Sequence, residues 1–217
     1  LTNDHGMAVI IVLLLALLLG AIAAALVTLT TTETSISLSF RHAQETSHGA
    51  EAALERALHD LAAMADWSAA LAAPPANVTS TFDDGETVPR TPAGRSLDLT
   101  RLTAERQAES DVRAGPDVFG ADSPAWRLFA HAPLGALMTG DGFDLPLYLV
   151  VWVADDEWDG DGNPAVDRNG RILVRAHAFG AGGAERTAEA RVGRTVGGDL
   201  QIVARTVRAV LRHAGAY

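Results

Sequence analysis

The sequence predicts an α+β protein in which one long N-terminal helix packs on an antiparallel β-sheet. The first observation is a run without charge from residue 7 to residue 32, which continues with helical spacing and without a proline until Pro74. The second is the C-terminal half, where short segments rich in apolar residues alternate with clusters of Gly, Pro and Asp. A chain of 217 residues is long enough for one globular head and one anchor.

The uncharged run predicts a membrane-spanning helix over residues 7–30. Its apolar part, Met7–Leu29, exceeds the roughly 20 residues that cross the hydrocarbon core of a bilayer. A cleaved secretory signal is the alternative interpretation. Such a signal has a basic start and a shorter apolar core, whereas the six residues before Met7 include no Lys or Arg.

An amphipathic continuation of the helix is expected over residues 31–71, with the helix itself ending near Trp67. Small Ala and Ser residues at alternate apolar positions favour close packing against a sheet or against neighbouring helices, and a long coiled coil is the alternative. The apolar positions are spaced by 4 and 3 in turn and form one narrow stripe: Ile36, Phe40, Ala43, Ser47, Ala50, Leu54, Ala57, Leu61 and Met64.

Residues 72–124 are predicted to connect the helix to the head. The stretch from residue 72 to residue 96 is rich in Pro, Gly, Thr and Ser, which is typical of a loop. Leu97, Leu99 and Leu102 indicate a short surface helix that ends near Glu109.

Residues 125–217 are predicted to form the antiparallel β-sheet head. One face of this sheet is expected to lie on the helix stripe, through alternate residues of two strands. The GAGG sequence at residues 180–183 is a hairpin turn candidate, and residues 200–212 suit a helix and a strand equally. The expected strands are residues 125–132, 145–154, 171–179 and 184–192, and the residues expected on the helix are Leu147, Leu149, Val151, Val153, Ile172, Val174, Ala176 and Ala178.

Composition excludes several classes of function. The formal net charge of −10 has the wrong sign for a nucleic-acid surface, which needs clustered Lys and Arg. The chain contains no cysteine, which excludes disulfides, thiolate metal sites and a thiol nucleophile. No HExxH, GxSxG or P-loop sequence occurs, and the histidines are scattered, so we expect no enzymatic activity.

One segment, Asp155–Gly170, has the composition of a metal site. Its clustered carboxylates and glycines suit a hard cation such as Ca²⁺, which takes six to eight oxygen ligands. The segment is not an EF-hand, because Pro164 stands where that loop needs Gly and Gly170 where it needs Glu. A solvated acidic hairpin loop is the alternative. The expected calcium ligands are Asp159, Asp161, Asn163 and Asp167, with Trp126, Trp152 and Trp158 expected in the core or sheltering this loop.

Residues 6–66 resemble type IV pilins, in particular the PilX-like group of minor pilins. A short segment ends at Gly6, an apolar helix follows at once, and the continuation reads SFRHAQETSHGAEAALERALHDL. In that continuation Ala43, Gln44 and residues 50–54 match a segment of the PilX-like group. The resemblance is good for residues 6–66 and looser for the strand, acidic loop and strand over residues 145–192.

The resemblance implies that residues 1–6 are a prepilin leader. Prepilin peptidase would cut between Gly6 and Met7, and the new amine would be methylated. The protein would be stored in the bacterial inner membrane and would then join an extracellular pilus, with a structural or adhesive role, by packing its helix against other pilin subunits.

Three further positions on the helix carry expectations from this resemblance. Most pilins have Glu at the fifth residue after the cut, where this chain has Ile11. Because an unpaired carboxylate is costly in a membrane, its absence is typical of a minor subunit that primes or caps the filament. Gly20 matches a position at which pilin helices unwind, and Glu33 lies in the Thr- and Glu-containing stretch that follows the apolar helix.

Three other functions remain as alternatives. An initiating pseudopilin of a type II secretion system also lacks the usual Glu, but has a larger head. A single-pass membrane-anchored extracytoplasmic binding domain would share the apolar helix without assembling. A metal-dependent enzyme using the acidic segment would need a base or nucleophile that the segment does not supply.

Overall fold

A long helix and an antiparallel sheet form the protein, which a computed structural model describes over residues 4–74, 78–114, 119–137, 145–195 and 197–209. The chain divides into two units, Leu1–Arg41 and His42–Tyr217. Helix α1, Asp4–Ala63, contributes residues to both units. The second unit also holds the short helices α2, Ser68–Leu71, and η1 to η3, Gly120–Asp122, Leu134–Leu137 and Ala181–Gly183, and the longer helix α3, Leu99–Ala114.

Helix α1 ends four residues before the predicted position. The backbone NH of Met64 and the indole Nε1 of Trp67 both donate to the carbonyl of Leu61, at 3.2 and 2.8 Å. The Trp67 ring is buried in the core, and the chain leaves the axis of α1 before it. Helix α2 begins at the next residue, Ser68. The amphipathic continuation over residues 31–71 is therefore two helices rather than one, because a side chain satisfies a carbonyl of the last turn.

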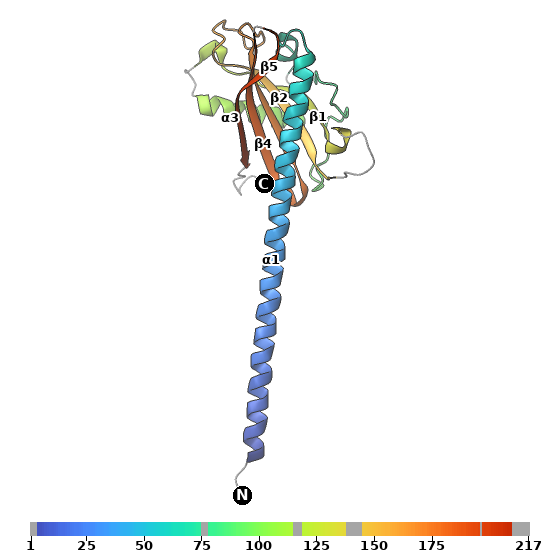
Figure 1. Ribbon diagram of the computed structural model, residues 1–217, viewed down its shortest axis with the longest axis vertical. Coiled ribbons are helices and arrows are strands. Elements are labelled where there is room, and N and C mark those ends of the chain that lie inside the picture. The colour runs from blue at the N-terminus through green and yellow to red at the C-terminus, as the bar shows by residue number, and fades with distance from the viewer. Residues whose placement is uncertain (1–3, 75–77, 115–118, 138–144, 196, 210–217) are drawn as a thin grey trace. The chain divides into compact units, whose positions relative to one another are not determined.

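The head is an antiparallel meander of five strands in the order β1-β2-β3-β4-β5 (Figure 1). The four predicted strands are confirmed, with ends that differ by at most three residues. Of the ambiguous residues 200–212, residues 200–209 form a strand that pairs with β4 from Arg186 to Arg194, and residues 210–212 lie outside the described residues. The strands are β1, Arg127–Pro133; β2, Tyr148–Asp155; β3, Arg171–Phe179; β4, Glu185–Arg194; and β5, Leu200–Ala209.

The turn between β3 and β4 is the predicted GAGG hairpin. Gly182 and Gly183 have φ angles of 62° and 74°, a left-handed conformation that residues with a Cβ atom rarely adopt. The glycines therefore set the register in which β3 and β4 pair.

The part of α1 within the head unit lies across one face of the sheet, as predicted (Figure 1). The stripe is buried from Ala50 to Leu61, whereas Ile36 and Phe40, which belong to the first unit, are exposed. Burial of the stripe and of the facing sheet residues supplies the main hydrophobic stabilisation of the head. The contacting residues include Ala50, Ala53, Leu54, Ala57 and Leu61 of α1 and all eight predicted sheet residues.

Two glycines allow α1 to approach the sheet closely. A Cβ atom on Gly49 would lie 2.6 Å from Cδ1 of Leu147, and one on Gly180 would lie 2.5 Å from Oγ1 of Thr46. Both distances are shorter than any van der Waals contact, so the helix and the end of β3 meet at positions that only glycine fits.

The second face of the sheet is also buried over β1 and β2, whereas residues 201–208 of β5 are exposed. Leu99 and Leu102 of α3 pack with Leu97 against Trp152 and Val150 of β2, and the Nε1 group of Trp152 donates to Thr103 Oγ1 at 2.9 Å. The predicted surface helix is thus an amphipathic cover that continues to Ala114. Of the three tryptophans expected in the core or at the loop, Trp126 and Trp152 are buried and Trp158 is 63% exposed.

Residues 78–86, here called the strap, cover the free edge of β1. The backbone NH groups of Thr79 and Ser80 donate to Phe129 O, and the strap also exchanges backbone hydrogen bonds with His131. Ser80 donates a side-chain hydrogen bond to Asp60 of α1. Part of the predicted connecting loop is therefore paired with the sheet, which blocks strand addition at this edge.

Replacing Gly49 by Leu is expected to reduce the free energy of unfolding of the head by about 1–3 kcal/mol, because the new side chain overlaps Leu147 beneath α1. Urea unfolding of the full chain in detergent, followed by tryptophan fluorescence, measures this change. Gly20→Leu is the matched control on the same helix, since a Cβ atom there has no neighbour within 4 Å. Equal losses in both variants would contradict close packing at Gly49.

Candidate functional site

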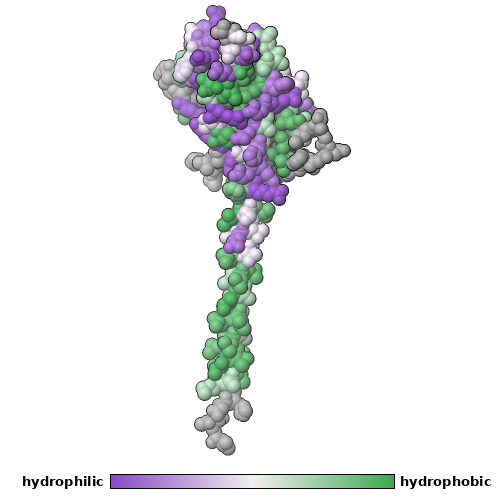
Figure 2. Space-filling model, in the orientation of Figure 1, coloured by the Kyte–Doolittle hydropathy of each residue, from purple (hydrophilic) through white to green (hydrophobic). Residues whose placement is uncertain are grey.

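The part of α1 that belongs to the first unit exposes an apolar surface. Such a surface is suited to insertion into a membrane or to packing against other helices. The Met, Val, Ile and Leu side chains of residues 7–29 are 48–71% exposed, and Figure 2 shows apolar side chains along the visible face of this segment. By length and composition α1 could cross a membrane. An apolar surface of this extent is stable only in lipid or against other apolar helices.

A threonine-rich stretch lies at the end of the apolar segment. The hydroxyl groups of these threonines are satisfied by hydrogen bonds within the helix. Each hydroxyl donates to the backbone carbonyl four residues earlier, at 2.8–2.9 Å. Side chains satisfied within their own helix tolerate both lipid and water. The stretch therefore suits the boundary of a membrane, and its members are Thr28, Thr30, Thr31, Thr32 and Thr34.

The residues expected to act in processing and assembly all lie on α1. Gly6 and Met7 are within the helix, which begins at Asp4. Ile11 is 52% exposed, Gly20 has an open surface, and Glu33 is an exposed helical residue. Their roles in cleavage, docking and helix unwinding stay predictions.

The connection between β2 and β3 gathers three carboxylates. One oxygen each of Asp155, Asp159 and Asp167 lie within 4.8 Å of one another. Two of these residues, Asp159 and Asp167, are among the predicted calcium ligands. Asp155 is not, because it ends strand β2 and lies outside the spacing on which the sequence prediction was based.

The other two predicted ligands serve the turn of the loop itself. Asp161 forms an ion pair with Arg168 at 3.1 Å and accepts a hydrogen bond from the backbone NH of Asn163 at 2.8 Å. The side-chain oxygen of Asn163 accepts from the backbone NH of Ala165 at 3.2 Å. The structure therefore brings Asp159 and Asp167 together with Asp155, and leaves Asp161 outside this cluster.

Backbone NH groups hold the three carboxylates in place. Asp155 Oδ1 accepts from the NH of Asp156 at 3.0 Å, and Asp159 Oδ2 accepts from the NH of Arg168 at 2.9 Å. Asp167 Oδ1 accepts from the NH groups of Gly170 and Arg171 at 2.7 and 3.1 Å. The glycines and asparagines of the segment thus fold the loop back on itself and aim acidic side chains at one point.

The electrostatics of this acidic cluster favour a bound cation. Burial raises the pKa of Asp155 to about 7, and burial also raises the pKa of Asp167. Asp159 Oδ1 is buried and has no hydrogen-bond partner in the part of the chain that the structure describes, which is costly for a carboxylate oxygen. An all-oxygen donor set with an unsatisfied buried atom fits Ca²⁺ better than a transition metal.

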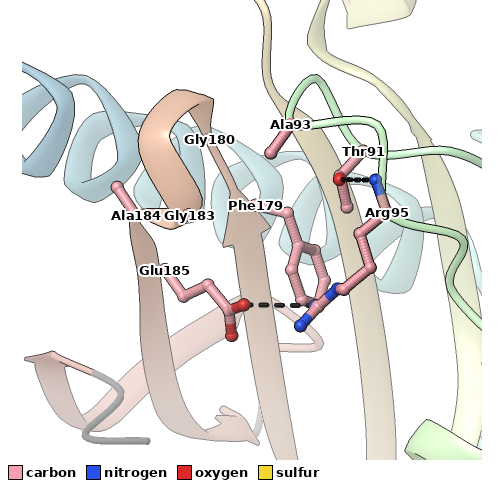
Figure 3. A pocket seen from close by; sticks show the side chains of 8 residues that line it. All are labelled: Thr91, Ala93, Arg95, Phe179, Gly180, Gly183, Ala184 and Glu185. Carbon is pink, nitrogen blue, oxygen red and sulfur yellow. Dashed lines mark hydrogen bonds and ion pairs between the residues drawn. The ribbon is translucent and has the colours of Figure 1, made fainter.

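A pocket of about 230 Å³ opens beside the β3–β4 hairpin (Figure 3). Arg95 crosses it and forms an ion pair with Glu185 at 3.1 Å, with its guanidinium group 5.4 Å from the ring centre of Phe179. The backbone NH of Arg95 donates to Thr91 Oγ1 at 3.1 Å. These contacts fix the segment before α3 against the sheet.

His177 lies next to this pocket and is 1% exposed. Its ring stacks on Phe179 with a centroid distance of 4.1 Å, and Nε2 lies 3.3 Å from Glu185 Oε2 without good hydrogen-bond geometry. Burial lowers the pKa of His177 despite the opposing effect of Glu185. The imidazole is therefore a neutral core group that has no access to a ligand as a general base.

Comparison of this chain with protein-family models, with curated proteins and with solved structures finds no match. Two features of the molecule point to a function: the exposed apolar surface of α1 and the acidic cluster between β2 and β3.

The neutral state of His177 predicts that acid destabilises the head. Unfolded histidine takes up a proton below a pH of about 6.5, whereas His177 in the folded state resists it. This group contributes stability that is present above its unfolded pKa and is lost as the pH falls. His177→Gln is expected to flatten the pH dependence of the free energy of unfolding below pH 6.5 by up to about 1.4 kcal/mol per pH unit.

Urea unfolding at a series of pH values tests this expectation. The exposed His59 supplies the control variant His59→Gln. If His177→Gln and the original chain lose stability with the same slope below pH 6.5, the neutral buried imidazole is excluded as the cause.

Proposed function

We propose that this chain is a type IV pilin-like subunit of the PilX-like minor class, with a structural or adhesive role and no catalytic one. Prepilin peptidase removes residues 1–6, and residues 7–29 hold the precursor in a bacterial inner membrane. The mature subunit then joins an extracellular filament, or primes or caps it, by exchanging lipid contacts for contacts with the helices of other subunits.

The observation that carries this proposal is that α1 is apolar and exposed in its N-terminal part and packs on the sheet in its C-terminal part. One unbroken helix has an exposed apolar segment in its first unit and a buried stripe of small residues in its second. A plain membrane anchor has no need of a helical connection to the core of its domain. A polymerising subunit does, because force and orientation pass from the helix contacts to the head.

The absence of a charge at Ile11 supports a minor subunit. Among residues 7–32 there is no Asp, Glu, Lys or Arg, so insertion below another subunit gains no ion pair within the membrane. Such a subunit is stable without a neighbour above it. This favours the first or last position in a filament over the interior.

Shearing of filaments from cells that produce the full chain tests the proposal. We expect the chain in the sheared fraction, with Met7 as a methylated N-terminal residue identified by mass spectrometry. Gly6→Val, which places a branched side chain at the cut site, is expected to keep residues 1–6 and to remain in the membrane. Ala8→Val is the matched control on the other side of the cut.

Two results would overturn this function. Recovery of the chain only from membranes, with residues 1–6 retained, would identify it as a membrane-anchored extracytoplasmic domain. Incorporation of the Gly6→Val variant as efficiently as Ala8→Val would show that processing at Gly6 is not required.

We further infer that Asp155, Asp159 and Asp167 hold a Ca²⁺ ion that fixes the β2–β3 loop. The support is the convergence of three carboxylates and the buried Asp159 oxygen without a hydrogen-bond partner among the described residues. A cation there would relieve the repulsion of buried like charges. In a chain without cysteine, it would restrain a long loop as a disulfide does elsewhere.

Calcium is therefore expected to stabilise the head by about 2.7 kcal/mol at a concentration 100 times its Kd. Thermal unfolding with Ca²⁺ and with a chelator measures the difference. Asp155→Asn and Asp159→Asn are expected to abolish it, whereas Asp161→Asn retains it because Asp161 lies outside the cluster. Loss of the effect in Asp161→Asn but not in Asp155→Asn would favour the ligand set predicted from sequence. An unchanged effect in Asp159→Asn would exclude this site.

A further inference from the structure

The two edges of the sheet differ in how they are covered. The strap closes the edge of β1, whereas β5, at the other end of the meander (Figure 1), pairs with β4 and with no further strand in the part of the chain that the structure describes. Residues 201–208 of β5 are all exposed. The outer side of β5 is therefore an open row of backbone NH and C=O groups, which natural proteins usually cover or protect.

One face of β5 continues the apolar core beneath α1. Residues that are directly opposite each other in an antiparallel pair point to the same face of the sheet. Ile202 pairs with Val192, and Val207 pairs with Ala188; both partners belong to the core under α1. Ile202 is 38% exposed and Val207 is 36% exposed. The core under α1 thus reaches the edge of the sheet, where its last apolar side chains are only partly covered.

The other face of β5 carries an exposed cation. Arg208 follows Val207 directly, so its side chain points to the second face of the sheet. It is exposed, and it forms no ion pair with any residue that the structure describes. Arg205 differs, because it points to the α1 face and donates to Glu55 Oε1 at 2.7 Å. Arg208 is therefore the arginine of β5 that remains available to a partner.

The charge of β5 disfavours a second copy of this chain as the partner. Residues 200–209 include two Arg and no Asp or Glu, although the whole chain has a formal net charge of −10. Antiparallel pairing of β5 with β5 of another copy would gather the arginines of both strands with no acidic group on either strand. Like charges across a strand pair are destabilising, whereas opposite charges stabilise it. The charge therefore favours a partner strand that carries Asp or Glu.

We propose that β5 is a docking edge for a strand of another protein in which acidic and apolar residues alternate. The backbone of this partner strand extends the sheet beyond β5. Its apolar side chains lie on the α1 face beside Val207 and prolong the core. Its acidic side chains lie on the second face and pair with Arg208.

A bulge defines the regular part of this edge. Arg191 of β4 pairs with Ala204, and the next residue, Val192, pairs with Ile202, so Val203 is an extra residue in β5. Such a bulge interrupts the ladder and bends the strand. Pairing with β4 is regular from Ala204 to Ala209. The partner strand is therefore expected along residues 204–209, a length of about 20 Å.

The docking edge belongs to the head unit alone, so its use does not depend on assembly of α1 into a filament. The strap already occupies the opposite edge through backbone hydrogen bonds with Phe129 and His131. Each head can therefore accept one partner strand, and the extended sheet does not propagate from head to head.

Binding of synthetic peptides to the full chain in detergent tests this edge. The first peptide alternates Glu and Val, and the second alternates Lys and Val. The third is the Glu and Val peptide with its central Val replaced by Pro, which keeps the negative charge but removes a backbone donor and disrupts strand pairing. Fluorescence anisotropy is expected to show about tenfold tighter binding of the first peptide than of the other two.

A charge reversal at Arg208 provides the matched test on the protein. Arg208→Glu is expected to weaken binding of the Glu and Val peptide about fivefold and to strengthen binding of the Lys and Val peptide by a similar factor. Arg101→Glu is the control, because its side chain is 74% exposed on α3 and the variant changes the net charge equally. This control is expected to leave both affinities unchanged.

Hydrogen exchange locates the bound peptide. The amides of residues 204–208 are expected to gain protection when the Glu and Val peptide is added. Three results would overturn the proposal: no binding of this peptide, equal binding of its proline variant, or protection gained at the strap instead of β5. A dimer in which β5 is protected without any peptide would assign the edge to a second copy of the chain and would also overturn it.

Discussion

The close approach of α1 to the sheet is the constraint on which the rest of the head depends. Small side chains and Gly49 let the helix lie directly on β2 and β3, with Leu54 and Leu61 filling the space between them. Asp60 of the helix accepts a hydrogen bond from Ser80 of the strap. At the end of the helix, the Leu61 carbonyl accepts a hydrogen bond from the indole of Trp67. Because protein interiors are close-packed, a larger residue at the contact would disturb all of these elements together.

Both faces of the sheet are buried over β2, and α1 and α3 cover them. Over β2 the side chains alternate between the α1 core and the α3 core, and none of the residues from Tyr148 to Ala154 is accessible. Charged groups also lie within the sheet: Arg175 of β3 is 3% exposed and pairs with Glu109 of α3 at 3.0 Å and with Glu189 of β4. The acidic cluster lies at the end of β2, where the proposed Ca²⁺ ion would determine how firmly the β2–β3 loop is held.

The same helix serves two environments because its composition changes along its length. Residues 7–29 expose apolar side chains around the helix and require lipid or other apolar helices, whereas residues 50–61 are apolar only toward the sheet. The threonine hydroxyls between them bond within the helix. A subunit that is stored in a membrane and then packed against its neighbours needs this combination, which is why the proposed function rests on α1.

Elements with a local signal could be predicted from the sequence alone. Periodicity set the long helix, the stripe on the sheet and four strands, and Asp, Asn and Gly marked the acidic loop. The sequence did not predict which carboxylates of that loop meet, that residues 200–209 form a strand, or that α3 covers the second face over β1 and β2. Each of these depends on contacts between residues far apart in the chain. His131 illustrates the difference, because no spacing relates it to Asp83 and Asp84 until the strap pairs with β1.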